Sequence, residues 1–244
     1  MTTSHSSSPA DARLARVLVV GVGGLGSPAA LALARAGIGG LGLVDPDVVE
    51  ISNLHRQPLY GDADVGGAKV AVAADRLRAV APALRITTWQ ERFPDGDAAA
   101  ALPRFDVVLD GTDTIAAKFA VNDAAVAAGV PLVHAGVLGF RAQLMTVLPG
   151  ETACYRCVFE EPPAPGEVPS CEEAGILGPT AALAGALAAA EAVRLITGER
   201  AGYAGRLLVI DVFGGHHRSV PLGRRPHCRT CGSAPGRALG SIAS

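Results

Sequence analysis

Polar and charged side chains follow a glycine-rich loop in this chain, in an order suited to binding a polyphosphate. The loop reads Gly21-Val22-Gly23-Gly24-Leu25-Gly26 and comes directly after the apolar run Arg16–Val20. A strand, glycine turn and helix in this order present backbone N–H groups and a helix N-terminus to an anion. Gly23, Gly24 and Gly26 are therefore candidate nucleotide-binding residues, and the alternative is that they serve only helix–strand packing.

An acidic residue ends the next apolar run, which reads LGLV. This residue, Asp45, follows Gly26 at nearly the spacing of about 20 residues at which a carboxylate reaches ribose hydroxyls. Asp47 is a further candidate beside it. These features alone also fit an NAD(P)-dependent oxidoreductase, although we find no constellation for hydride transfer.

The segment after Asp45 favours ATP over NAD, because it adds neutral polar and cationic groups that suit a charged polyphosphate. Arg56 can form paired hydrogen bonds to phosphate oxygens, and Lys69 can act as a point charge, although in isolation Lys69 would be taken for a solvated helix lysine. The candidates in this segment are Asn53, Arg56, Gln57 and Lys69.

Asp113 follows a further apolar run and precedes a helix-like stretch, with Thr114 beside it. Its carboxylate suits Mg²⁺, and the alternative is that Asp113 only caps the helix. Together with Arg56 and Lys69 it fits attack of a carboxylate on the α-phosphate of ATP, in which two anions must be brought together. No general base is required, because a carboxylate is already ionised at pH 7.

Four of the five cysteines form two CxxC pairs, Cys154 with Cys157 and Cys228 with Cys231. Two such pairs predict a structural zinc site with four cysteine ligands, and the alternative is a redox-active CxxC. The pairs are too far apart for a zinc ribbon, so zinc would staple the C-terminal part to the middle of the chain. The remaining Cys171 lies in a proline-rich acidic stretch that we expect to be a loop. Cys171 is either a mobile nucleophile or an incidental surface thiol.

Apolar runs alternate with helix-like stretches along the first half of the chain. Strands are expected at residues 16–20, 41–44, 84–88, 105–110 and 131–136, and helices at 25–36, 69–80 and 115–128. This alternation predicts an α/β fold, a Rossmann-like, doubly wound and mainly parallel sheet. Strands are also expected at 143–148, 207–211 and 218–222. They are joined without crossover helices, which predicts an antiparallel C-terminal extension. The glycine loop, Asp45 and Asp113 should converge in one crevice, because ligands bind at the carboxyl ends of such strands.

The composition fits one compact domain. The chain has 244 residues, 49% of them hydrophobic and 18% charged, with a net charge of −2 and no basic cluster, which argues against nucleic acid. The alanine-rich stretch Pro179–Ile196 carries Glu191 and Arg194 and reads as a buried helix, so no membrane span is expected. We expect a disordered lead over residues 1–12, one nucleotide-binding domain over 13–232 and a flexible tail over 233–244. The N-terminus has no apolar core of a signal peptide, which predicts a cytoplasmic protein.

In this order and spacing, the motifs resemble those of the ThiF/MoeB/HesA family, the bacterial relatives of ubiquitin-activating enzymes. They are GVGGLGSPAALALARAGIG, ISNLHRQ, DVGGAK, CYRC, SCEEAGILGP and CRTC. The resemblance implies adenylylation of the C-terminal glycine of a small ubiquitin-like sulfur carrier ending in Gly-Gly, with ATP, Mg²⁺ and Zn²⁺. It places Gly24 in the nucleotide loop and Asp45 at the ribose. It places Ser52 to Arg56 and Lys69 at the phosphates, and Asp113 with Thr114 at Mg²⁺.

The same resemblance makes Cys154, Cys157, Cys228 and Cys231 the zinc ligands, and Cys171 the active-site cysteine of members that use one. We expect Cys171 to act at most after adenylation. The family's TDN motif reads Thr112-Asp113-Thr114 here, and an arginine-bearing RYxRQ segment that reaches the partner subunit is missing. We therefore expect a homodimer with weakened ATP affinity or turnover.

No rhodanese-type domain follows the last CxxC, so the sulfur donor is expected to be a separate protein. The molybdopterin branch is favoured by the stretch EPPAPGEVPSCEEAG, and the thiamine branch and peptide or secondary-metabolite carriers remain alternatives. A non-catalytic, zinc-stapled scaffold that binds a ubiquitin-like partner is the alternative from another class.

Overall fold

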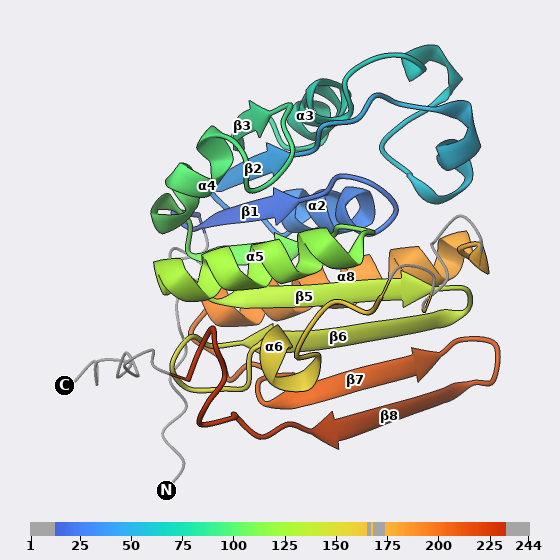
Figure 1. The fold of residues 1–244 in the computed structure, drawn as a ribbon. Coiled ribbons are helices and arrows are strands. Elements are labelled where there is room, and N and C mark those ends of the chain that lie inside the picture. The colour runs from blue at the N-terminus through green and yellow to red at the C-terminus, as the bar shows by residue number, and fades with distance from the viewer. Residues whose placement is uncertain (1–12, 165–166, 168–173, 233–244) are drawn as a thin grey trace, which may run out of the picture.

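One eight-stranded sheet organises the part of the chain that the computed structural model describes, residues 13–164, 167 and 174–232. The strand order is β3-β2-β1-β4-β5-β6-β7-β8, and β1 to β5 are parallel whereas β6, β7 and β8 are antiparallel (Figure 1). The strands are β1 Arg16–Val20, β2 Gly40–Val44, β3 Arg85–Trp89, β4 Val107–Asp110, β5 Leu132–Leu138, β6 Arg141–Val147, β7 Arg206–Asp211 and β8 His216–Pro221. The predicted fold class, a mainly parallel sheet with an antiparallel extension, is confirmed.

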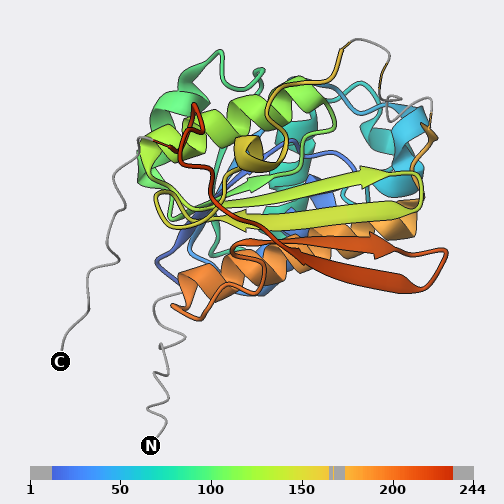
Figure 2. The ribbon, with the colours of Figure 1, turned by 60° about the horizontal axis from the view of Figure 1, so that its bottom comes forward.

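Helices cover both faces of the sheet. Figure 1 shows α5 on one face and α8 on the other, and Figure 2 shows α8 running below β5 and β6. The helices are α2 Gly26–Arg35, α3 Lys69–Val80, α4 Asp97–Ala101, α5 Ile115–Ala128, α6 Tyr155–Val158 and α8 Gly178–Ile196, and the 3-10 helices are η1 Ile51–Arg56, η2 Asp62–Asp64 and η3 Leu102–Arg104. The short helices α4, α6, η1, η2 and η3 were not predicted, because they are too short to show a helical period.

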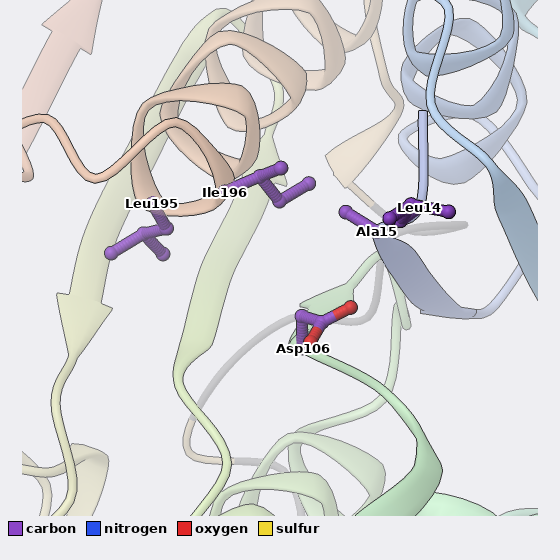
Figure 3. A pocket seen from close by; sticks show the side chains of 5 residues that line it. All are labelled: Leu14, Ala15, Asp106, Leu195 and Ile196. Carbon is purple, nitrogen blue, oxygen red and sulfur yellow. The ribbon is translucent and has the colours of Figure 1, made fainter. Parts of the chain in front are cut away.

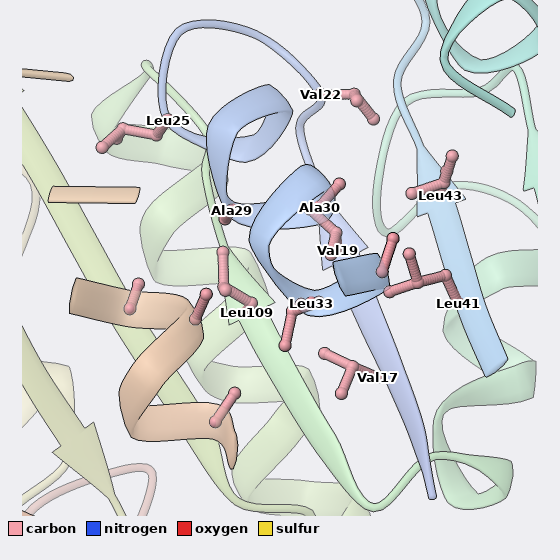
Figure 4. Close-up of a cluster of buried hydrophobic side chains, with 14 of the residues drawn as sticks. Val17, Val19, Val22, Leu25, Ala29, Ala30, Leu33, Leu41, Leu43 and Leu109 are labelled. Carbon is pink, nitrogen blue, oxygen red and sulfur yellow. The ribbon is translucent and has the colours of Figure 1, made fainter. Parts of the chain in front are cut away.

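The central strands are buried on both sides, which explains their nearly continuous apolar sequences. In β1, Val17 and Val19 pack into the layer that contains α2, α3 and α8, whereas Leu18 and Val20 pack into the layer that contains α4 and α5. Figure 4 shows the first of these layers, in which Leu33 of α2 lies over the sheet. The buried apolar clusters on the two faces of the sheet hold the carboxyl ends of β1, β2 and β4 in place relative to one another.

Helix α8 is long and apolar enough by length and composition to cross a membrane. It instead packs on β4, β5, β6 and α2, and 44% of its apolar window is buried inside the protein. Its acidic residue Glu191 is buried and accepts hydrogen bonds from Thr146 Oγ1 (2.8 Å) and from the backbone N–H groups of Gly202 (3.0 Å) and Tyr203 (2.8 Å). The interpretation of residues 179–196 as a core helix agrees with these contacts.

The predicted lead (residues 1–12), the predicted tail (233–244) and Cys171 lie outside the described residues. The domain boundaries therefore stay predictions. His134, on β5, is buried as a core histidine should be, and it lies 2.7 Å from a carboxylate oxygen of Asp110.

Candidate functional site

The glycine loop between β1 and α2 can be built only with glycine at two of its positions. Gly21 has φ = +82°, in the left-handed region that favours glycine, and its N–H donates to Val44 O at 2.7 Å. A Cβ on Gly26 would lie 1.8 Å from the Gly21 carbonyl oxygen. Tyr60 Oη donates to Val22 O at 2.8 Å and fixes the loop from the side. The loop therefore turns tightly enough to bring backbone N–H groups to the start of α2.

Gly26→Ala is expected to destabilise the protein strongly, whereas Gly23→Ala should leave its stability almost unchanged. The new methyl group at position 26 collides with backbone, but at position 23 its nearest neighbour is Gln57 Nε2 at 3.5 Å, an ordinary contact. We expect a loss of about 2 kcal/mol or more for Gly26→Ala, the scale of overpacking and backbone strain. Thermal unfolding of the two variants side by side measures the difference, and equal midpoints would contradict the loop geometry.

A cavity of 390 Å³ lies at the carboxyl ends of β1, β2 and β4, beside the glycine loop. This volume is within the range of about 300 to 1,000 Å³ that is usual for small-molecule sites. Most predicted site residues line it: Gly23, Gly24, Asp45, Asp47, Asn53, Arg56, Gln57, Lys69, Asp113 and Thr114. Gly26 and Ser52 do not line the cavity, and Gly26 instead shapes the loop.

A smaller cavity of 270 Å³ lies elsewhere on the molecule, between Leu14, Ala15, Asp106, Leu195 and Ile196 (Figure 3). Its acidic side chain is Asp106, whose Oδ2 already accepts a hydrogen bond from the Arg16 N–H at 2.7 Å. None of the predicted site residues lines it. The candidate site is therefore the larger cavity.

Asp45 and Lys69 form a buried charged group on one wall of the cavity. Asp45 Oδ2 accepts a hydrogen bond from the Val22 N–H at 2.7 Å, so the carboxylate also holds the glycine loop. Lys69 Nζ lies 2.9 Å from Asp47 Oδ2 and 4.0 Å from Asp45 Oδ1. Burial raises the pKa of Asp45, and the positive charge of Lys69 opposes that shift. With only 5% of its surface exposed, Lys69 is not a solvated helix lysine, and that alternative is wrong.

The 3-10 helix η1 brings Arg56 against the glycine loop. A Cβ on Gly24 would lie 3.4 Å from Arg56 Cγ and Cδ. Arg56 Nη2 donates to Asn53 Oδ1, and Asn53 Nδ2 in turn donates to Glu50 Oε2 at 3.1 Å. These contacts orient a guanidinium on the cavity wall without an ion pair to a carboxylate among the described residues.

Gln57 gives an independent sign of a ligand. Its side chain is buried, and Oε1 has no hydrogen-bond partner among the described residues. An unsatisfied buried acceptor costs about 1 to 3 kcal/mol, so such a group on a cavity wall fits a donor supplied by a bound molecule. The residues present therefore fit a nucleotide with hydroxyl or amino donors.

Thr114, and not Asp113, caps helix α5. Thr114 Oγ1 accepts a hydrogen bond from the Ala117 N–H at 3.3 Å, as an N-cap side chain does. The alternative that Asp113 serves only as a helix cap is therefore wrong. Asp113 lies on the cavity wall, one residue before the cap, where an acidic side chain can serve a cation.

The sequence did not single out a second charged group at the cavity. Lys118 of α5 lines the cavity, and its Nζ donates to Ala135 O at 2.6 Å and lies 3.5 Å from Asp110 Oδ2. Asp110 ends β4 and is completely buried. Burial raises its pKa, but Lys118 and His134 outweigh that effect and hold the pKa below its usual value. The sequence did offer a signal for Asp110, because this charged residue ends the apolar run of residues 105–110. Glu91 and Arg92, after β3, also line the cavity.

The two CxxC pairs meet in space. The Sγ atoms of Cys154 and Cys228 lie 3.6 Å apart, those of Cys157 and Cys231 3.4 Å apart, and all four lie within 4.8 Å of one another. Four sulfurs at about 2.3 Å around a tetrahedral zinc would be about 3.8 Å apart, so the cluster fits that ion. Burial raises the pKa of Cys154, because a buried thiolate is unfavourable unless a cation such as zinc lies beside it.

Asp123 of α5 holds both cysteine pairs. Its carboxylate accepts from Arg156 Nη2 (2.7 Å) in the first pair and from Thr230 Oγ1 (2.9 Å) in the second. In addition, the Tyr155 N–H donates to Asn122 Oδ1 at 2.8 Å. The cysteine cluster is therefore built against the helix that begins next to Asp113.

The fold and the cavity together define a Rossmann-type protein with a candidate ligand site at the carboxyl ends of its parallel strands. The ThiF family model matches residues 6–230, and the chain belongs to the ThiF family. This confirms the family that the sequence motifs indicated.

The chain is 43% identical to the "Sulfur carrier protein adenylyltransferase" of Thermus thermophilus, over 91% of this chain and 83% of that protein. It is 44% identical to the pig "Adenylyltransferase and sulfurtransferase MOCS3" over 91% of this chain, but spans only 49% of that relative. The structure of Escherichia coli MccB with ATP superposes with a TM-score of 0.79 at 25% identity, covering 92% of this chain and 69% of that one. The predicted enzyme class, an adenylyltransferase, is confirmed by these relatives.

Proposed function

We propose that this protein uses ATP to adenylylate the C-terminal glycine carboxylate of a ubiquitin-like sulfur-carrier protein. The observation that carries the proposal is the meeting of Arg56, Lys69 and Asp113 with the glycine loop on the walls of one cavity. The name of the Thermus thermophilus relative, which matches along most of both chains, supports a sulfur carrier as the substrate.

In the reaction, a carboxylate oxygen of the carrier attacks the α-phosphorus of ATP, and pyrophosphate leaves. The carboxylate needs no base, since it is ionised at neutral pH. Arg56 and Lys69 hold phosphate oxygens and offset their negative charge, and such preorganised charge is most effective in the transition state. Asp113 would hold Mg²⁺, which supplies further positive charge to the phosphates.

Lys69 has a counter-ion before the nucleotide arrives, because Asp47 lies 2.9 Å from its ammonium group. Asp47 is well exposed, with 59% of its side chain accessible, and can turn away at little cost when phosphate oxygens replace it. Asp45, by contrast, is held by the Val22 N–H and stays in place to accept ribose hydroxyls. In this proposal the two aspartates therefore have separate roles.

We further propose that Cys154, Cys157, Cys228 and Cys231 hold one structural zinc ion. The four sulfurs leave no position open for substrate, which is the arrangement of structural and not catalytic zinc sites. Zinc would tie residues 228–231 to residues 154–157 and, through Asp123, both of these to α5.

ATP–pyrophosphate exchange with a carrier ending in Gly-Gly tests the proposal. We expect exchange that requires Mg²⁺ and the carrier, and no exchange with the same carrier lacking its last glycine. A parallel thermal-shift series should show stabilisation by ATP with Mg²⁺ and none by NAD. Stabilisation by NAD alone would support an oxidoreductase, and a carrier that binds without any exchange would support a non-catalytic scaffold.

The finer assignments remain predictions: the molybdopterin or thiamine branch, a separate sulfur donor, the homodimer and a cytoplasmic location. Cys171 lies outside the described residues, and its action after adenylation is likewise still a prediction. The peptide-bound structures of Escherichia coli MccB, such as that with MccA, keep a peptide substrate among the alternatives.

A further inference from the structure

Among the described residues, Asp110 is the one carboxylate at the end of a central strand that is wholly buried yet does not line the nucleotide cavity. Its two oxygens face different groups, and only Oδ1 accepts hydrogen bonds from the described residues. Oδ1 accepts from the Thr112 N–H at 2.9 Å and from Thr112 Oγ1 at 2.6 Å, and Oδ2 lies 2.7 Å from His134 Nδ1. The two hydrogen bonds from Thr112 tie the backbone at residue 112 to this buried carboxylate at the end of β4.

The backbone that Asp110 holds is the segment that leads to Asp113. Its first residue, Gly111, has its N–H on Val20 O at 2.8 Å. A Cβ on Gly111 would lie 2.8 Å from Gly21 O and 3.0 Å from the Gly26 nitrogen, so the segment lies directly against the glycine loop. Gly111, Thr112 and Asp113 all line the cavity. A shift of this segment would move the Asp113 carboxylate relative to the nucleotide loop.

The far side of Asp110 faces charged and aromatic groups of α5, β5 and α6. Lys118 Nζ lies 3.5 Å from Oδ2 and is anchored on Ala135 O at 2.6 Å. The centre of the His134 ring lies 4.3 Å from that of the Tyr155 ring, and in the sequence Tyr155 lies between two of the clustered cysteines, Cys154 and Cys157. Asp110 thus links Lys118 of α5 and His134 of β5 to the segment that carries Asp113.

We propose that Asp110 is a positioning residue, which holds Gly111–Asp113 against the glycine loop so that Asp113 is placed for Mg²⁺. The inference rests on the proposed function, because it assumes that Asp113 serves the metal of an ATP-dependent reaction. It predicts that loss of the Asp110 charge, or of the Thr112 hydroxyl, loosens this segment and weakens metal use while the nucleotide loop remains folded.

The test uses Asp110→Asn and Thr112→Val, with Asp106→Asn as the matched control. Asp106 lies just before β4, at its opposite end, is exposed, and can keep its hydrogen bond from the Arg16 N–H through the amide oxygen. Thr112→Val keeps every buried charge, so it remains informative if Asp110→Asn fails to fold. The first measurement is hydrogen–deuterium exchange of residues 111–114 in the ligand-free protein, which is independent of activity.

We expect faster exchange in this segment for both variants and no change for the control. In ATP–pyrophosphate exchange, we expect the Mg²⁺ concentration for half-maximal rate to rise about tenfold in Asp110→Asn and less in Thr112→Val, the scale of outer-sphere positioning groups. The rate at saturating Mg²⁺ should fall less than the apparent metal affinity.

Wild-type hydrogen exchange and an unchanged Mg²⁺ requirement in both variants would overturn the inference. Faster hydrogen exchange with an unchanged Mg²⁺ requirement would also overturn it, because Asp110 would then be only a structural counter-ion. A wild-type protein without any carrier-dependent exchange would instead refute the proposed function, and the hydrogen-exchange result would still report whether Asp110 holds the segment.

Discussion

Arg56→Ala and Asp113→Ala are each expected to abolish carrier-dependent ATP–pyrophosphate exchange, a fall of at least two orders of magnitude. Each change removes a charge on the wall of the nucleotide cavity. Charges aimed at the transferring phosphate are commonly worth about 3 kcal/mol or more in the transition state, which corresponds to more than a hundredfold in rate. The measurement is the initial exchange rate with saturating carrier, ATP and Mg²⁺.

Both variants should remain folded, because Asp113 is exposed and Arg56 is only half-buried, so neither change opens a space in the core. Arg56 contacts its own 3-10 helix, through Asn53 and the Ser52 carbonyl, and the helix cap beside Asp113 is Thr114. Arg76→Ala and Asp75→Ala are the matched controls, since both side chains lie on α3 and do not line the cavity. Near-normal exchange in Arg56→Ala and Asp113→Ala, with a carrier proven to work, would show that the phosphate site is assigned wrongly.

Cys228→Ser, or removal of zinc by a chelator, is expected to lower the thermal midpoint by about 10 °C or more. Structural zinc contributes about 10 to 16 kcal/mol of binding free energy in small zinc domains. Loss of one thiolate ligand lowers the zinc affinity and with it part of this stabilisation. In a domain of this size, each kcal/mol lost shifts the midpoint by about 2 to 4 °C. The wild-type protein, purified without chelators, should contain one zinc ion per chain by elemental analysis.

Re-adding zinc provides the control for this prediction. It should restore the midpoint of the chelated wild-type protein but not that of Cys228→Ser, which lacks one of four sulfurs that lie within 4.8 Å of one another. Zinc-free wild-type protein with an unchanged midpoint would contradict the structural role of the cluster. The ligands also support α5 through Asp123, so we expect the exchange rate to fall together with the zinc content.

The longer helices and the central strands of this protein follow from its sequence alone, whereas its short helices do not. The apolar runs that become β1, β2 and β4 were located from hydrophobic pattern, and the helix over residues 69–80 was predicted with its observed bounds. The glycine loop, the two CxxC pairs and the acidic residue after β2 are also local patterns, because each depends on neighbours within a few residues. Even the crevice was predictable, since parallel strands must end on one side of the sheet.

The partners of the charged side chains were decided only by the tertiary structure. No spacing in the sequence indicates that Lys69 meets Asp47, or that Asp110 lies between His134 and Lys118, because these groups come from separate elements. The choice of Thr114 over Asp113 as the helix cap was likewise open in the sequence, where either oxygen could serve. Sequence patterns report which face of an element is apolar, whereas the pairing of charges depends on how those elements pack across the sheet.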